Sequence, residues 1–309
     1  MGKKIFKTID EQIDILEHKG ISFEDFPNAS DVLVRENYFF LNGYRHLFLK
    51  SQNDSSFIEG TKFSELYGLF SFDRQLRNIL FKNILIVENN IKSIFSYVIS
   101  KNHGYKESSY LDVSIFTKDP HKIRQINDLI RKMKRQIRVN GKQHNATKHY
   151  IQNYGYLPLW IVVKVLSFGI VSEVYSILTR EDQEEIASYF GVTVENLLVY
   201  LPILSNYRNL CAHEDICYEH KSLTYIYPTK YHSMLQIPKE DGEYIYGLND
   251  MFSLIIILKE VLRQEDFTLL MHELTYELDV LDGKLEVISL SKVLDRMGFP
   301  PNYNEIVRL

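Results

Sequence analysis

The sequence contains few of the residues that stabilise small secreted or zinc-binding domains. Only two of its 309 residues are cysteines, Cys211 and Cys217, and they do not form a Cys-x-x-Cys pair. This number and spacing exclude a disulfide scaffold and a structural zinc ribbon, and they are typical of a protein in a reducing compartment. We therefore expect two free thiols, and neither a metal ion nor any other cofactor.

Long apolar runs and an excess of positive charge are also absent. The most apolar segment, residues 157–171, is interrupted by Lys164 and is shorter than the roughly 20 residues that a membrane-spanning helix needs. The first residues are charged and contain no apolar signal-peptide core. The net charge of -4 argues against a protein that coats DNA over its whole surface, although local basic patches stay open. We expect a cytoplasmic protein without a membrane segment.

The 8 prolines and 14 glycines are few for a chain of this length, and apolar residues recur at helical spacing through most of it. This pattern predicts an all-α fold. A tyrosine-rich stretch at 221–247 predicts a loop or small hairpin, and Pro202 is expected to begin a new helix. We expect an N-terminal segment at 1–60, a core at 61–217 and a C-terminal segment at 218–309. The predicted helices are 9–19, 29–42, 63–102, 160–178, 180–190, 250–263 and 266–278.

Positive charge is concentrated in residues 118–148, which carry ten Lys or Arg and two acids. Such a stretch can attract RNA phosphates without sequence specificity, since binding of this kind requires only charges along a surface. A solvated helix face is the open alternative. The candidate RNA-binding residues are Arg124, Arg131, Lys132, Lys134, Arg135 and Arg138.

The helix that follows Pro202 has an apolar side, which contains Cys211, and a polar side. Arg208, Asn209 and His213 belong to the polar side. An imidazole can take a proton from a ribose 2′-hydroxyl or give one to the leaving oxygen, and a guanidinium can neutralise the phosphate. Asn209 could orient either group. One histidine cannot be base and acid at once, so a two-fold dimer with two copies would complete the site.

The Arg-to-His spacing is a weak signal by itself, because such a pair is expected about once by chance and a second one, Arg138 to His144, is present. An ordinary surface histidine is the alternative interpretation of His213. On the long helix at 63–102, Asp73 and Glu88 are charged residues among apolar ones. We expect them to form internal pairs.

Several segments, in order, resemble the Abi family of bacterial abortive-infection proteins, in particular the AbiD and AbiF group. The resemblance covers most of the chain and includes the HEPN-type ribonuclease motif Arg-Asn-x-x-x-His, which maps onto Arg208, Asn209 and His213. The sequence departs from the family pattern after His213, where Glu214 and Asp215 replace a second histidine and an aromatic residue. The other matching segments are Glu11-Gln12, Asn37-Tyr38, Asn42-Gly43-Tyr44, Gly60-Thr61-Lys62-Phe63, residues 72–77, Tyr110-Leu111-Asp112, residues 157–160 and 166–169, and, more weakly, residues 247–250.

The resemblance implies a HEPN-like helical bundle with additional N-terminal helices. It also implies a toxin that cleaves RNA without a metal ion, acts as a homodimer with a composite site and has a cognate antitoxin, either a small noncoding RNA or a protein. The alternative is a noncatalytic module that binds RNA or the antitoxin, in which case residues 118–148 matter and His213 does not.

Overall fold

The computed structural model describes residues 5–51 and 54–309 of the chain. These ranges are mainly helical, and their only sheet is a two-stranded hairpin, so the predicted all-α class is confirmed. Among the helices of these ranges, none combines the length and apolar character that a membrane-spanning segment requires. The N-terminal elements are α1 (Ile9–His18), α2 (Phe26–Glu36), α3 (Tyr38–Asn42), the 3-10 helix η1 (Gly43–Phe48) and α4 (Phe63–His103).

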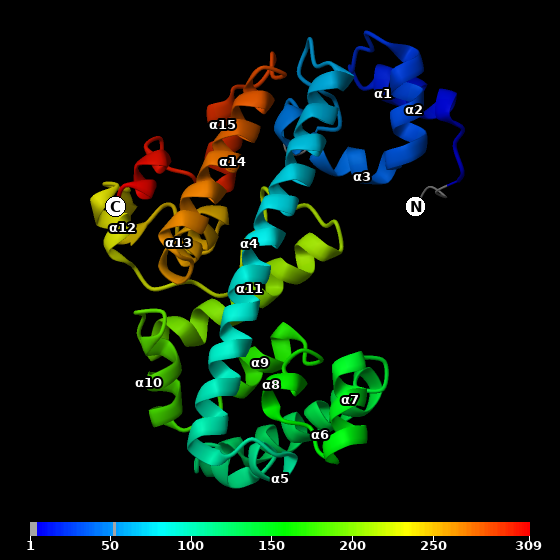
Figure 1. Ribbon diagram of the computed structural model, residues 1–309. Helices are drawn as coiled ribbons and strands as arrows, with labels where there is room; N and C mark the ends of the chain where they lie inside the picture. The colour runs from blue at the N-terminus through cyan, green and yellow to red at the C-terminus, as the bar shows by residue number, and fades with distance from the viewer. Residues whose placement is uncertain (1–4, 52–53) are drawn as a thin grey trace.

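Helix α4 is the axis of the molecule (Figure 1). Its apolar residues recur along 41 residues, and those that are buried include Leu66, Leu76, Ile84, Val87 and Val98. In Figure 1, α1–α3 lie on one side of its upper half and α14 on the other, while α11 crosses its middle and α5–α10 surround its lower half. The N-terminal and C-terminal segments therefore share one central helix.

The middle of the chain consists mostly of short helices. The elements are α5 (Glu107–Tyr110), η2 (Val113–Ile115), η3 (Pro120–Lys122), α6 (Ile123–Asn140), α7 (Asn145–Tyr154), α8 (Leu159–Val162), α9 (Phe168–Tyr175), α10 (Arg180–Ser188) and α11 (Val194–Ala212). The C-terminal elements are α12 (Lys230–Met234), β1 (Lys239–Glu240), β2 (Glu243–Tyr244), α13 (Met251–Val261), α14 (Gln264–Asp282), α15 (Leu290–Met297) and η4 (Tyr303–Val307). The hairpin β1–β2 lies within the stretch where the sequence predicted a loop or hairpin.

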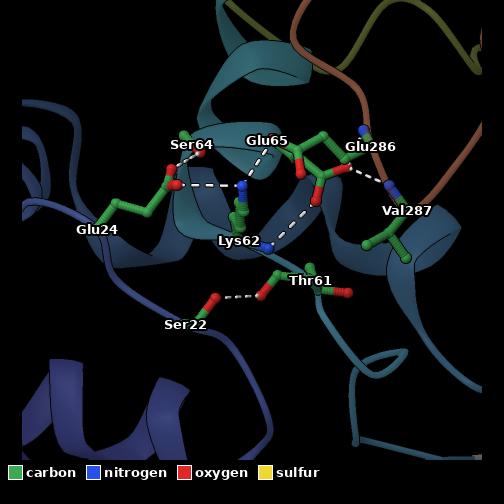
Figure 2. Close-up of polar contacts among 8 residues, drawn as sticks. All are labelled: Ser22, Glu24, Thr61, Lys62, Ser64, Glu65, Glu286 and Val287. Carbon is green, nitrogen blue, oxygen red and sulfur yellow. Dashed lines mark hydrogen bonds and ion pairs between the residues drawn. The ribbon is translucent and has the colours of Figure 1, made fainter.

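The first turn of α4 joins three distant parts of the chain (Figure 2). Glu65 is fully buried and accepts hydrogen bonds from the backbone amides of Lys62, Glu286 and Val287, at 3.2, 2.7 and 2.8 Å. The Lys62 ammonium forms ion pairs with Glu24 and Glu286. The matching segment Gly60-Thr61-Lys62-Phe63 is thus explained by its structural role, which is to fix the start of α4.

Three helix predictions were wrong in detail. The helix expected at 29–42 is divided into α2 and α3 because Asn37 adopts a left-handed backbone with φ 64°, and its side chain then accepts a hydrogen bond from the amide of Phe39. The helix expected at 160–178 is divided into α8 and α9, the latter capped by Ser167. Pro202 lies inside α11 on its exposed side and does not begin a helix.

Candidate functional site

The motif helix α11 has the two faces that the sequence predicts. Tyr207 and Cys211 are buried in the core, whereas Asn209 and His213 are exposed. His213 is the C-cap residue of α11, and its amide donates to the Asn209 carbonyl at 3.0 Å. The side chains of Asn209 and His213 are therefore available to a ligand at the end of a helix whose other face is fixed by packing.

Arg208 is held against the central helix α4. Its Nε lies 3.5 Å from Oε2 of Glu88, and its guanidinium lies 5.6 Å from the centre of the Phe81 ring. Glu88 is buried and also binds the Lys92 ammonium at 2.6 Å, as expected for an internal pair. The Arg208 side chain keeps 35% of its surface exposed. Glu88 and Phe81 thus restrict the guanidinium, and the rest of it stays open to solvent.

His213 lines a pocket of about 410 Å³ that Arg208 and Asn209 do not line. Within one chain, the imidazole and the guanidinium of the motif are therefore not brought together in this pocket. The lining residues are Arg35, Glu36, Phe39, Phe40, Asn42, Gly43, Tyr44, Arg45, His46, Phe70, Arg74, Arg77, His213, Glu214, Asp215 and Ile216.

A buried polar cluster lies at the base of this pocket. Asp73 of α4 is fully buried and accepts hydrogen bonds from the Tyr44 hydroxyl, the Arg77 guanidinium and the amides of Cys217 and Tyr218, at distances between 2.5 and 3.1 Å. Arg77 Nη1 also donates to the Asp215 carbonyl at 3.4 Å. The cluster therefore fixes the loop that follows His213 onto α4, which positions the end of the motif helix.

Gly43 lies close to this loop, so a side chain at position 43 would have to displace the end of the Ile216 side chain. A Cβ atom at Gly43 would lie 2.7 Å from Cδ1 of Ile216. Three segments that are separate in the sequence therefore meet at this pocket: residues 42–44, residues 72–77 and the end of the motif helix. Residue chemistry and spacing did not indicate Tyr44, Arg77 or Arg45, although the family resemblance had marked the segments that contain Tyr44 and Arg77.

The basic helix α6 lies apart from this pocket, in the lower half of the molecule and packed on α9 (Figure 1). Its buried side contains Ile126, Leu129, Ile130 and Met133. Arg131 pairs with Asp128, and Lys132 pairs with Glu173. The six candidate RNA-binding residues Arg124, Arg131, Lys132, Lys134, Arg135 and Arg138 are all exposed.

Within the described ranges, no group of three or more His, Cys, Asp or Glu side chains is arranged to hold a metal ion. Both cysteines are free and buried. Burial raises the pKa of the Cys217 thiol, so this thiol is neutral at neutral pH.

Comparison with known protein families gives a match that includes α11 and the pocket. The family described as Abi-like protein matches residues 31–219. No curated protein and no solved structure matches the chain. Because the family match covers more than half of the sequence, the chain belongs to the Abi-like protein family.

Proposed function

We propose that this Abi-like protein is an endoribonuclease toxin of a bacterial abortive-infection system, and that it cleaves RNA without a metal ion. The observation that carries the proposal is the polar end of α11. There, Asn209 and His213 are exposed and Arg208 is held by Glu88, on a helix whose opposite face is buried. Positioned groups of this kind favour catalysis, because little reorganisation is needed at the moment of reaction.

In the proposed reaction, the ribose 2′-oxygen attacks the adjacent phosphorus and the bond from phosphorus to the 5′-oxygen breaks. The products are a 2′,3′-cyclic phosphate and a 5′-hydroxyl. One imidazole removes the proton of the 2′-hydroxyl, and an acid returns a proton to the 5′-oxygen. Arg208 neutralises the charge that develops on the phosphoryl oxygens, and Asn209 orients the phosphate.

A two-fold dimer is part of the proposal. One His213 can supply only one of the two proton transfers, and within one chain Arg208 does not line the His213 pocket. A dimer that places two copies of the motif face to face would supply both histidines and bring an arginine to each phosphate.

The test is incubation of total bacterial RNA and of tRNA with the protein in EDTA. The wild-type protein should produce ends with 2′,3′-cyclic phosphates, whereas His213→Ala and Arg208→Ala should not. His18→Ala is the matched control, because His18 is an exposed histidine on α1. Cleavage that survives in His213→Ala, or that occurs only with added metal, would refute the proposed mechanism.

The second candidate function is a noncatalytic module that binds RNA or the antitoxin. The exposed positive side chains of α6 favour it, since they can bind phosphates without any contribution from His213. Reversal of charge at Arg131, Lys134 and Arg135 should then weaken RNA binding and reduce its dependence on salt. RNA that is bound but stays intact, with equal binding by His213→Ala, would favour this function over the nuclease.

A further inference from the structure

The pocket beside His213 is formed by three segments that are far apart in the sequence. One runs from the end of α2 through α3 to η1, the second is a part of α4, and the third is the loop after α11. Its volume of about 410 Å³ falls within the roughly 300–1,000 Å³ of pockets that bind small molecules. All of its lining residues lie in the range matched by the family, residues 31–219.

Two exposed phenylalanines form one wall of the pocket. Phe39 and Phe40 are 73% and 56% exposed, and their rings meet edge to face with centroids 5.9 Å apart. The short helix α3 presents them because the chain turns at Asn37. Exposed aromatic rings at the edge of a cavity are surfaces on which an unpaired nucleobase can stack.

The positive groups of the pocket differ in how far they are already neutralised. Arg74 binds Glu36 through two hydrogen bonds, and Arg77 is buried with Asp73. Within the described part of the chain, Arg45 forms no ion pair; its Nη1 donates to the Asn42 carbonyl at 3.4 Å. Arg45 is therefore the guanidinium in this pocket that is most available to a phosphate.

Hydrogen-bond acceptors face these positive groups. Glu214 and Asp215 are exposed, and in the described ranges neither carboxylate forms an ion pair at hydrogen-bonding distance. Glu214 has a left-handed backbone with φ 58°, which turns the chain just after His213. Asn42 Oδ1 is buried and has no hydrogen-bond partner in the described structure. Such acceptors match the exocyclic amino groups of adenine, cytosine and guanine, whereas uracil has no amino group.

We propose that this pocket binds one nucleotide of the RNA next to the cleaved bond and selects a base with an amino group. The base stacks on Phe40, its amino group donates to Glu214, and its phosphate pairs with Arg45. The inference rests on the proposed nuclease function and deepens it. It also assigns a role to Glu214, a carboxylate that would otherwise only repel RNA: Glu214 accepts a hydrogen bond from the base, and Arg45 binds the phosphate.

Binding of the four nucleoside 5′-monophosphates to the wild-type protein tests the inference without any cleavage. Isothermal titration calorimetry should show tighter binding of AMP, CMP or GMP than of UMP, by at least about fivefold for the preferred base. Phe40→Ala should weaken the binding of that nucleotide at least about fivefold, in keeping with the usual strength of base stacking. The matched control is Tyr276→Ala, because Tyr276 is an exposed aromatic residue on α14 that does not line the pocket.

The substitution Glu214→Gln separates the contribution of the hydrogen bond to the base from the contribution of stacking on Phe40. The glutamine amide can donate to a uracil oxygen as well as accept from an amino group. The ratio of the affinity for the preferred nucleotide to the affinity for UMP should therefore fall toward one, while UMP still binds. Circular dichroism should show the same helix content for each variant. Equal affinity of all four nucleotides for the wild-type protein, or the same affinity in Phe40→Ala as in wild type, would overturn the inference.

The outcomes for the pocket and for the nuclease are distinguishable. If nucleotides fail to bind while RNA is cleaved in EDTA and His213→Ala is inactive, the nuclease stands and the pocket is refuted. If nucleotides bind with the expected preference and no RNA is cleaved, the nuclease is refuted; the pocket then stands as a base-selective nucleotide site, and its place beside a cleaved bond is refuted with the nuclease.

Discussion

Replacement of Asp73 by alanine tests whether the buried cluster below the pocket holds the fold together. The substitution removes the acceptor of four hydrogen bonds and leaves the Arg77 guanidinium, whose side chain is 4% exposed, without a counterion. Breaking a buried ion pair by removing one partner typically costs about 3–5 kcal/mol, because the other charge is left unpaired. We therefore expect the free energy of unfolding to fall by about 3–5 kcal/mol and the melting temperature to fall by roughly 10 °C.

The chain contains a matched control for this experiment. Asp31 and Arg35 form the same kind of Asp–Arg pair, also four residues apart on a helix, but both side chains are more than half exposed. Solvent screens such a pair, so Asp31→Ala should leave stability unchanged within the error of urea denaturation. The reasoning is refuted if Asp73→Ala and Asp31→Ala give the same midpoint and the same free energy of unfolding.

A double substitution separates the two causes of the stability loss in Asp73→Ala, which are the unpaired Arg77 charge and the missing hydrogen-bond acceptor. Asp73→Leu combined with Arg77→Met removes the unpaired charge and fills the site with apolar atoms, so it should recover part of the stability lost in Asp73→Ala. Recovery should be incomplete, because the amides of Cys217 and Tyr218 still lack their acceptor, at about 1–3 kcal/mol for each buried group. Urea denaturation of the three proteins side by side measures both effects.

Three further predictions concern other buried polar groups. Glu88→Gln should loosen Arg208 and lower RNA cleavage by roughly ten- to a hundredfold in a single-turnover assay, while circular dichroism shows the native helix content. Glu65→Ala should cost about 1–3 kcal/mol in urea denaturation and increase proteolysis near Glu286, because the amides of Lys62, Glu286 and Val287 lose their acceptor. Burial lowers the pKa of His232 below its ordinary value of 6.5, so below that pH the unfolded chain takes up a proton that the folded chain does not, and stability falls as the pH falls. The stability lost in His232→Gln should therefore be smaller at about pH 5 than at about pH 8 in thermal denaturation, and a pH-independent loss would contradict this assignment.

The parts of the fold that were predictable are those with strong local signals. The long helix expected at 63–102 is α4, which ends one residue later at His103 and is followed by Gly104 with a positive φ. The break at Asn37 left only a weak signal in the sequence, because no glycine or proline marks it and an asparagine adopts a positive φ only at some of its positions. Pro202 was misleading, since a proline on the exposed side of a helix can lie within it.

The candidate site was predictable only where it depends on one helix. The spacing in α11 correctly separates the buried Tyr207 and Cys211 from the exposed Asn209 and His213. The pocket was not predictable from spacing, because Tyr44 lies 29 residues before Asp73 and Cys217 lies 144 residues after it. Contacts at such separations leave no periodic signal, and only the family resemblance marked their segments.

The contact between α4 and α14 has a consequence for synthesis on the ribosome. The upper half of α4 packs against α14, with Leu281 approaching Gly68, and Glu65 accepts the amides of Glu286 and Val287. After α4 has been synthesised, the ribosome must therefore add some two hundred further residues before this side of the helix is covered. At the usual rate of bacterial translation, this takes about 10–40 s. Prematurely terminated chains leave that side of α4 exposed to chaperones and proteases, so only chains translated through α14 and the segment after it complete the core that supports the pocket and the motif helix.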